Sequence, residues 1–260
     1  MIEILGPTEL TRAKDTGALV AGILQTLKDR STAGTNLLEI DRWAQEMILD
    51  AGAESCYVDY EPSFGRGPFG HYICTSVNDA VLHGLPHDYA LADGDLLSLD
   101  LAVSLHGVVA DSAISFVVGG AASPQDVAMI EATQRALAAG IAAARPGVPL
   151  GDVSHAIGSV LRKAGYPVNT EFGGHGVGST MHQDPHVPND GRPGRGYRLR
   201  AGMLLALEPW VMADTDELVT DDDGWTLRSA TGCRTAHSEH TVAITDDGAK
   251  ILTQARKNAG

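Results

Sequence analysis

Residues 96–118, with the sequence LLSLDLAVSLHGVVADSAISFVV, form the stretch that decides the fold. Two apolar runs rich in Leu, Val, Ile and Phe flank the short segment Leu105-His106-Gly107, which has the composition of a turn. This pattern predicts a β-hairpin with strands over residues 96–103 and 107–118.

One aspartate interrupts each strand of this hairpin, Asp100 in the first and Asp111 in the second. With the turn centred between Leu105 and His106, the two face each other, with Cβ atoms about 4.5–5.5 Å apart. Two bare carboxylates at that distance repel each other, and burial forces one of them to hold a proton. A divalent cation removes both problems. The alternative is that one Asp binds turn backbone while the other faces water.

Four amphipathic helices accompany the hairpin, two on each side of it in the chain. Apolar residues at spacings of three and four, together with cap and stop residues, predict the helices Thr8–Asp29, Thr35 to Ala51-Gly52, Ser123-Pro124 to Ala144, and Leu150 to Ala164-Gly165. After the fourth helix, strands are predicted over Gly202–Met212 and Ser238–Thr245, and the GRPGRG segment at 191–196 reads as a connecting loop.

The second and fourth helices resemble each other at an offset of 113 residues. Gly34, Leu37, Ala51 and Gly52 fall on Gly147, Leu150, Ala164 and Gly165. These matches lie at the helix entry, the core face and the helix stop, which indicates two structurally similar halves, about 1–120 and 121–260. The alternative is a chance agreement between two ordinary amphipathic helices.

Composition narrows the functional classes. The 260 residues are 43% hydrophobic and 20% charged, as expected for a packed globular protein. The net charge of −14 argues against direct binding to nucleic acid or to an anionic membrane. The sequence shows neither a membrane-length apolar run nor a signal-peptide pattern, so we expect a cytoplasmic protein. Cys56, Cys74 and Cys233 contain no CxxC pair and are expected to be reduced core thiols rather than zinc ligands.

Further polar residues lie in apolar or glycine-rich surroundings in the second half. His175 stands among glycines in EFGGHGVGSTMH, with His182 seven residues later. Glu208 lies in MLLALEPWV and Glu239 in HSEHTVAIT, where core residues are otherwise expected. Buried carboxylates without Lys or Arg nearby need another cation. Four carboxylates and one imidazole suit two divalent ions such as Mn, Fe, Co or Zn.

Eight short segments in this order are similar to the motifs of type I methionine aminopeptidases of family M24: VNDAVLHGLP, LLSLDLAV, DSA, GGHGVG, MHQDPHVPN, LALEPWV, DGWT and SEHTVAIT. The resemblance runs from about Val77 to the end. It implies the pita-bread fold, an α+β fold with two pseudo-symmetric halves around a curved antiparallel sheet flanked by helices. It also implies one catalytic domain over residues 1–260.

The resemblance further implies a site with two metal ions. By motif match, Asp100 chelates one ion, Asp111 and Glu239 bridge both, and His175 and Glu208 each ligate one. A water shared by two such ions loses its proton near neutral pH, against a pKa of about 15.7 for free water. The substrates implied are peptides and nascent chains that begin with methionine followed by a small residue.

Three residues are implied to act on the substrate. Glu208 is expected to be the general base that carries the proton of the water to the leaving amine. His182 is expected to stabilise the oxyanion, and His83 to hold the scissile amide nitrogen.

The methionine pocket is implied to contain Phe69, Cys74, Met181 and Trp225. For the two aromatic residues the alternative is ordinary core packing. The sequence departs from the family pattern in having Met181 for the common Phe, Ser238 for the common Tyr, and a longer loop from Tyr60 to His71. These departures concern the shape of the pocket and leave the expected ligands unchanged.

Two other functions share much of this pattern. An Xaa-Pro aminopeptidase or dipeptidase has the same ligand set, but such enzymes usually carry a large N-terminal domain, and about 76 residues precede VNDAVLHG. A non-catalytic binding module of this fold normally loses ligands or the two histidines His83 and His182. The sequence favours the aminopeptidase, expected as a monomer, and leaves open the physiological metal and any association with the ribosome.

Overall fold

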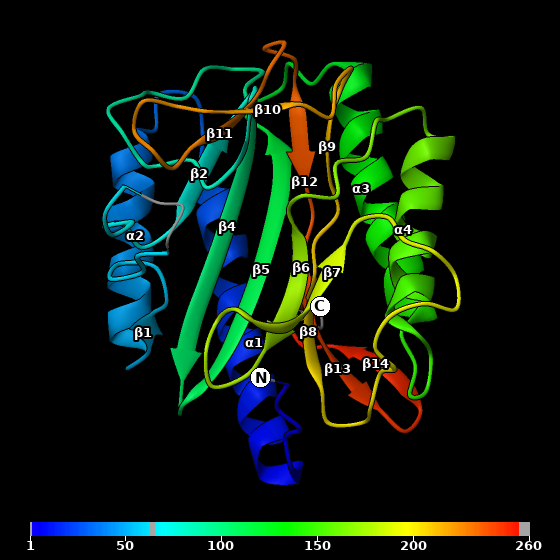
Figure 1. Ribbon diagram of the computed structural model, residues 1–260. Coiled ribbons are helices and arrows are strands. Elements are labelled where there is room, and N and C mark those ends of the chain that lie inside the picture. The colour runs from blue at the N-terminus through cyan, green and yellow to red at the C-terminus, as the bar shows by residue number, and fades with distance from the viewer. Residues whose placement is uncertain (1, 63–65, 255–260) are drawn as a thin grey trace, which may run out of the picture.

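The computed structural model describes residues 2–62 and 66–254 of the chain (Figure 1). Its helices are α1 (Pro7–Arg30), α2 (Leu37–Asp50), α3 (Pro124–Ala143) and α4 (Leu150–Lys163). All four predicted helices are therefore confirmed, with ends within two residues of the expected ones. Among the described residues, no helix combines the length and the apolar character needed to cross a membrane.

The ends of the helices follow from local sequence. The side chain of Asn36 accepts a hydrogen bond from Leu38 N at the start of α2, and Ser123 caps α3 in the same way through Asp126 N. Gly52 and Gly165 follow α2 and α4 with φ angles of 65° and 90°, a backbone conformation that favours glycine.

The strands pair antiparallel throughout, in four groups: β14-β13-β8-β6-β7, β1-β4-β2 with β5 on β4, β10-β11-β3, and β12-β9. Their bounds are β1 Glu54–Ser55, β2 Cys74–Val77, β3 Ala80–Leu82, β4 Leu96–Leu105, β5 Val108–Val117, β6 Gly173–Val177, β7 Gln183–Pro188, β8 Leu204–Leu207, β9 Trp210–Met212, β10 Leu218–Thr220, β11 Leu227–Ser229, β12 Thr235–His237, β13 His240–Thr245 and β14 Gly248–Ile251.

The hairpin of β4 and β5 is confirmed, but its predicted register is wrong by two residues. Leu105 pairs with Val108 around a two-residue turn of His106 and Gly107, whose φ angles are 55° and 77°. Such a turn needs positive φ at both central residues. Asp100 and Asp111 are therefore diagonal neighbours rather than directly opposite. A shift of two keeps each side chain on its predicted face of the sheet.

Of the two strands predicted after the fourth helix, Gly202–Met212 is interrupted, and Ser238–Thr245 is confirmed with its start two residues later. β8 ends before Glu208-Pro209 and β9 begins after them, while β12 and β13 flank Ser238-Glu239. Pro209 has no N–H to donate, so a ladder cannot continue through it. Glu208 and Glu239 each therefore lie between two strands, where a side chain is not limited to the alternation of a strand.

The same hydrogen-bond pattern occurs twice in the chain. Gly94 N donates to Val118 O at 2.9 Å and Val118 N to Asp95 O at 2.8 Å before β4. Before β8, Gly202 N donates to Ile244 O at 2.9 Å and Ile244 N to Met203 O at 2.8 Å. Likewise α2 and α4 have the same length of 14 residues. The sheets thus repeat in the second part of the chain the arrangement of the first.

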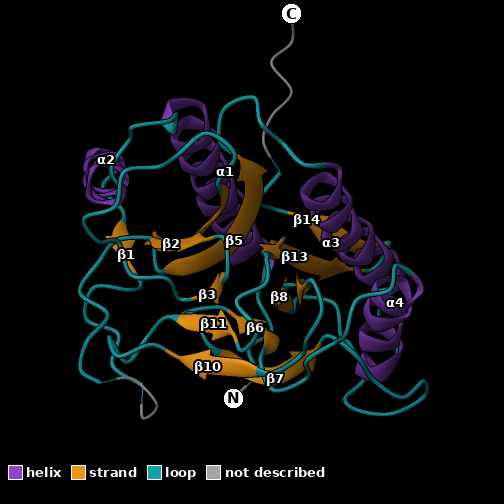
Figure 2. Cartoon of the chain, turned by 90° about the horizontal axis from the view of Figure 1, so that it is seen from above, coloured by secondary structure: helices purple, strands orange, loops and turns teal. Residues whose placement is uncertain are grey.

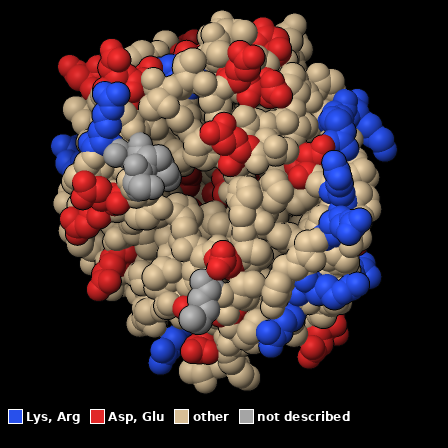
Figure 3. Space-filling model, in the orientation of Figure 1, with Lys and Arg blue, Asp and Glu red and all other residues tan. Residues whose placement is uncertain are grey.

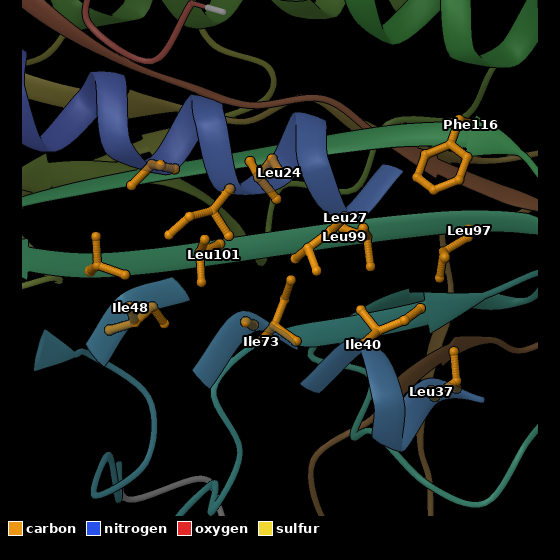
Figure 4. Close-up of a cluster of buried hydrophobic side chains, with 14 of the residues drawn as sticks. Leu24, Leu27, Leu37, Ile40, Ile48, Ile73, Leu97, Leu99, Leu101 and Phe116 are labelled. Atoms are coloured by element: carbon orange, nitrogen blue, oxygen red, sulfur yellow. The ribbon is translucent and has the colours of Figure 1, made fainter. Parts of the chain in front are cut away.

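The helices cover one side of the sheets, as the view from above shows (Figure 2). In the first part of the chain, Leu24, Leu27 and Ile40 of α1 and α2 pack against Leu99 and Leu101 of β4 (Figure 4). Because side chains alternate along a strand, Asp100 lies on the opposite face of β4 from its two leucine neighbours. The candidate site is therefore built on the side of the sheets away from the helices.

Candidate active site

A cavity of about 330 Å³ collects every site residue named from the sequence. Its lining includes Phe69, Cys74, His83, Asp100, Asp111, His175, Met181, His182, Glu208, Trp225 and Glu239. Figure 3 shows a hollow near the centre of one face, with acidic atoms visible inside it. Residues far apart in the sequence thus meet in one place, as Cys74 and Glu239 do at a separation of 165 positions.

The acidic residues and one histidine converge at the inner end of this cavity. One ligand atom each of Asp111, His175 and Glu239 lies within 4.8 Å of the others. His175 Nε2 is 3.9 Å from Asp111 Oδ2 and 3.6 Å from Glu208 Oε1. Asp100 lines the same space beside Asp111. This is a mixed oxygen and nitrogen donor set of the kind that borderline divalent metals take.

Hydrogen bonds fix the backbone on which Asp111 and Glu239 stand. Asp111 N donates to Thr241 Oγ1 at 2.8 Å, and that hydroxyl donates to Asp111 O at 2.8 Å. Glu239 N donates to the carbonyl of Ala113 at 2.9 Å, and Ser112 Oγ donates to the carbonyl of Glu239 at 2.6 Å. Strand β5 is thus joined to the residues between β12 and β13, which holds the two carboxylates together.

Glycines on both sides of His175 allow β6 to pack closely against β8 and β7. A Cβ on Gly174 would lie 2.1 Å from Ala206 O, and one on Gly176 would lie 2.0 Å from Asp184 O. His175 Nδ1 is 3.0 Å from its neighbour's carbonyl oxygen, that of Gly176. A carbonyl only accepts, so Nδ1 carries the proton and Nε2, which faces the acids, presents a lone pair. This is the arrangement that a metal-binding imidazole requires.

The carboxylates are strongly perturbed by burial and by one another. Burial, and next the charge of Asp100, raise the pKa of Glu208 to about 8. Burial raises the pKa of Asp100 to about 6. The pKa values of Asp111 and Glu239 are raised well above their usual range by burial first and then by neighbouring carboxylates. Such a group of acids needs a compensating positive charge.

A divalent cation fits this need better than any side chain nearby. Among the described residues, the basic groups that come close to these acids are His175 and His237, whose pKa values are lowered by burial to about 3. They are therefore neutral at neutral pH and supply no charge. Glu239 Oε1 is buried without a hydrogen-bond partner among the described residues. An orphaned carboxylate oxygen aimed into an acidic cluster is a free ligand position.

His83 and His182 stand beside the acidic cluster. Burial lowers the pKa of each to about 4, and for His83 the nearby His182 adds to the effect. The ring centroids of His175 and His182 are 4.3 Å apart in an edge-to-face arrangement. His83 takes a positive φ of 55°, at a bend after β3. Both rings are thus available as neutral hydrogen-bonding groups at neutral pH.

An apolar compartment adjoins these groups. Phe69 and Trp225 pack edge to face, with centroids 5.2 Å apart, and both are buried. Cys74 and Met181 belong to the same buried cluster. Among the cysteines, Cys74 is buried and Cys56 and Cys233 are half-buried, and all three are free thiols. The longer loop between Tyr60 and His71 is described except for residues 63–65, which lie outside the described residues.

Sequence reasoning missed several residues of the cavity lining: Tyr57, Tyr60, Leu82, Glu171, Phe172 and His186. Glu171 and Phe172 belong to the segment quoted for His175 and His186 to the motif MHQDPHVPN, so their position in the sequence was a usable signal. Tyr57 and Tyr60 precede the longer loop, and nothing in local pattern marks them as site residues.

Comparison with known proteins assigns a family to this fold and site. The model of "Metallopeptidase family M24" matches residues 11–246. Methionine aminopeptidase 1 of Mycobacterium tuberculosis is 43% identical over 252 residues, which cover 94% of this chain and 92% of that protein. The crystal structure of methionine aminopeptidase from Thermotoga maritima is 34% identical, with a TM-score of 0.92 over 98% of this chain and 100% of its own.

The fold extends to more distant proteins. The prolidase of Pyrococcus horikoshii has a TM-score of 0.75 at 19% identity, over 98% of this chain and 64% of its own. At that identity the likeness shows the shared fold alone, which is the predicted pita-bread fold. The chain belongs to metallopeptidase family M24 and, within it, to the methionine aminopeptidases. It is therefore a metal-dependent exopeptidase, and divalent metal is its cofactor.

Proposed function

We propose that this protein removes N-terminal methionine from peptides and nascent chains in the cytoplasm, with two divalent ions held by Asp100, Asp111, His175, Glu208 and Glu239. The observation that carries the proposal is the convergence of four carboxylates, two buried and two half-buried, with one Nε2 lone pair in a cavity that has an apolar compartment beside it. We also propose that residues 1–260 act as one catalytic domain whose halves divide near residue 120.

The role of each ligand is proposed from the place of its side chain in the cavity. Asp111 and Glu239, whose backbones are joined through Thr241 and Ser112, would bridge the ions. Asp100 would bind one ion, and His175 and Glu208 would bind the other. When bound, two such ions polarise the substrate carbonyl and lower the pKa of a shared water toward neutrality.

Glu208 is proposed as the general base and then the general acid. Its side chain lines the cavity where the acids and His175 converge, so it could accept the proton of the attacking water and pass it to the leaving amine. Its two carboxylate oxygens lie 3.6 Å from His175 Nε2 and 3.8 Å from His237 Nε2, which limits the directions in which it can turn.

His182 and His83 are proposed to bind the reacting peptide group. A neutral imidazole donates through one nitrogen, and His182 would donate to the carbonyl oxygen as negative charge develops on it. His83 would contact the scissile amide nitrogen. The compartment of Phe69, Cys74, Met181 and Trp225 would receive the methionine side chain, a flexible and polarizable group suited to an apolar site.

The test compares peptides on protein loaded with Mn, Fe, Co or Zn after chelation. Metal content is measured together with release of methionine from Met-Ala-Ser, with an Xaa-Pro peptide in parallel. We expect methionine release that disappears with chelator and returns with metal. Release from the Xaa-Pro peptide at a comparable rate would favour a dipeptidase-like specificity, and stoichiometric metal without any hydrolysis would favour a binding module.

A further inference from the structure

Two tyrosines of one turn, Tyr57 and Tyr60, contact two different residues of the cavity. Tyr60 N donates to Tyr57 O at 2.9 Å, which closes the turn. The Tyr57 hydroxyl donates to Asp100 Oδ1 at 2.7 Å, and the Tyr60 hydroxyl lies 2.7 Å from His182 Nδ1. One short segment therefore contacts both a proposed metal ligand and the proposed oxyanion donor.

We propose that Tyr57 and Tyr60 are positioning residues with separate tasks. Tyr57 orients the Asp100 carboxylate for metal binding, and Tyr60 holds His182 in the tautomer that carries its proton on Nε2. The proposal deepens the proposed function, because it rests on Asp100 as a ligand and His182 as a donor to the substrate.

The proposed tautomer of His182 requires the Tyr60 hydroxyl to be the donor, since a phenol can either donate or accept. A neutral imidazole carries one proton, and its other nitrogen accepts. A phenol remains protonated at neutral pH. When its O–H donates to Nδ1, the imidazole proton is on Nε2, the ring nitrogen left for a substrate. The opposite tautomer presents a lone pair there, and a lone pair repels a developing oxyanion.

The orientation of Asp100 follows from the hydrogen-bonding capacity of its carboxylate. An ionised carboxylate only accepts hydrogen bonds, and each oxygen has two lone-pair directions. Tyr57 occupies one direction of Oδ1, and its hydroxyl is 3.5 Å from Asp111 Oδ1, too far to share its proton equally. Cys74 and Asp111 also contact the Asp100 carboxylate, and the acceptor capacity that remains faces the cavity. Tyr57 itself is buried, and its ring packs on Phe69 with centroids 5.5 Å apart.

The turn is held in place independently of the two hydroxyls. Phe69 N donates to Tyr60 O and Gly70 N to Val58 O, each at 3.0 Å, while Cys56 N donates to Ala102 O of β4 at 3.2 Å. The ring of Tyr60 also lies 6.4 Å from that of Trp225. Removal of one hydroxyl therefore leaves the backbone and the packing of the turn intact.

The test of Tyr60 uses NMR of the histidine ring nitrogens and steady-state kinetics. In the wild-type protein, the His182 proton should be on Nε2. In Tyr60→Phe we expect a substantial Nδ1–H population, a kcat lower by about tenfold, and KM and metal affinity within about twofold of wild type. An Nδ1–H tautomer in the wild-type protein, or an unchanged tautomer in Tyr60→Phe, would overturn the role of Tyr60.

The test of Tyr57 is calorimetric titration of the chelated protein with Mn or Co. In Tyr57→Phe we expect metal affinity to fall by about 10-fold to 100-fold, with the His182 tautomer unchanged. Wild-type affinity in this variant would overturn the role of Tyr57. If the variant does not fold, wild-type protein with 3-fluorotyrosine is titrated with Zn instead. The fluorine signal of Tyr57 should shift with the first ion bound, and a signal that does not move would also overturn the role.

Tyr72→Phe is the matched control, because the Tyr72 hydroxyl bonds with Gln45 of α2 at 3.0 Å, away from the cavity. It should change neither the tautomer nor metal affinity. These readouts separate the inference from the proposed function. Wild-type protein that binds metal without releasing methionine contradicts the proposed function, whereas the tautomer and the affinities test the tyrosines by themselves.

Discussion

Asp100 and Glu208 occupy equivalent positions, 108 residues apart, in two segments with the same hydrogen-bond pattern at their starts. The first four residues of β4 and the four residues of β8 directly precede the two acids. β4 continues through Asp100, whereas β8 stops at Glu208 because Pro209 follows. The cavity thus receives one carboxylate from each segment, and the carboxylate at the break, that of Glu208, is the proposed general base.

The proposed bridging acids give the first prediction. Asp111→Ala or Glu239→Ala should abolish turnover with little change in the circular dichroism spectrum, because each carboxylate would contact both ions. Metal content should fall at the same time. Asp246→Ala, which removes an exposed acid, is the control and should behave as wild type. Wild-type activity in either cavity variant would contradict the assignment of the site.

The second prediction separates His182 from the ligands. His182→Ala should slow turnover by about 10²-fold to 10³-fold, the usual effect of losing one oxyanion donor. Metal stoichiometry should remain that of wild type, since His175 rather than His182 faces the acids with Nε2. Elemental analysis and kcat, measured on the same preparation, test this prediction. Loss of bound metal in His182→Ala would show that His182 is a ligand.

The third prediction concerns the stability of the metal-free protein. The pKa of Glu208 is about 8 in the folded state, whereas its ordinary value is 4.5. Between pH 4.5 and 8 the folded state therefore keeps the Glu208 proton, and the unfolded state has lost it. Stability therefore falls as pH rises through the window. His83 and His182, with pKa values lowered to about 4, act in the opposite direction below pH 6.5. Only between about pH 6.5 and 8 does the carboxylate effect act alone.

We therefore expect the melting temperature of the chelated protein to decrease from pH 6.5 to 8. Glu208→Gln should remove much of this decrease, because an amide does not titrate. Saturating metal should also remove it, since the cation stabilises the ionised carboxylates. Melting curves in chelator, with and without metal, measure the effect. A flat profile for the chelated wild type would show that Glu208 is already ionised without metal.

The hairpin shows how far sequence reasoning extends. Its apolar runs predicted both strands and placed Asp100 and Asp111 on one face, because facing depends only on a period of two. The register depends on turn geometry. The prediction treated Leu105-His106-Gly107 as a three-residue turn, whereas the structure has a two-residue turn with positive φ at His106 and Gly107. The observed pairing differs from the predicted one by two residues, and Asp100 and Asp111 still lie on the same face of the sheet.

The breaks at Glu208 and Glu239 and the two tyrosines could not be predicted in the same way. Apolar residues stand on both sides of Glu208-Pro209, so the pattern favoured an unbroken strand there, and the strand predicted over Ser238–Thr245 included Glu239. Pro209 was the available signal for the first break. Tyr57 and Tyr60 reach Asp100 and His182 through contacts 43 and 122 residues apart, and such contacts depend on tertiary packing.

The last prediction concerns specificity for the first two residues of the substrate. Trp225 lies 5.2 Å from Phe69 and 6.5 Å from His83 between ring centroids, so the apolar compartment ends close to the group proposed to hold the scissile amide. We expect efficient cleavage of Met-Ala, Met-Gly and Met-Ser peptides and poor cleavage of Met-Lys, Met-Phe and Leu-Ala peptides. Steady-state kcat/KM for each peptide is the measurement.

Trp225→Ala probes the mechanism of this selectivity. A pocket that distinguishes side chains only by missing methylenes gains about 1–3 kcal/mol, so steric exclusion by rigid aromatic walls must supply the rest. Removing the indole should lower kcat/KM for Met-Ala and narrow its advantage over Leu-Ala, because the excluded branched chain gains room. Val219→Ala, an exposed apolar residue of β10, is the control and should preserve the wild-type ratio. Comparable wild-type kcat/KM on Met-Ala and Leu-Ala would mean that Met181 and the longer loop have widened the pocket, leaving a general metal-dependent aminopeptidase.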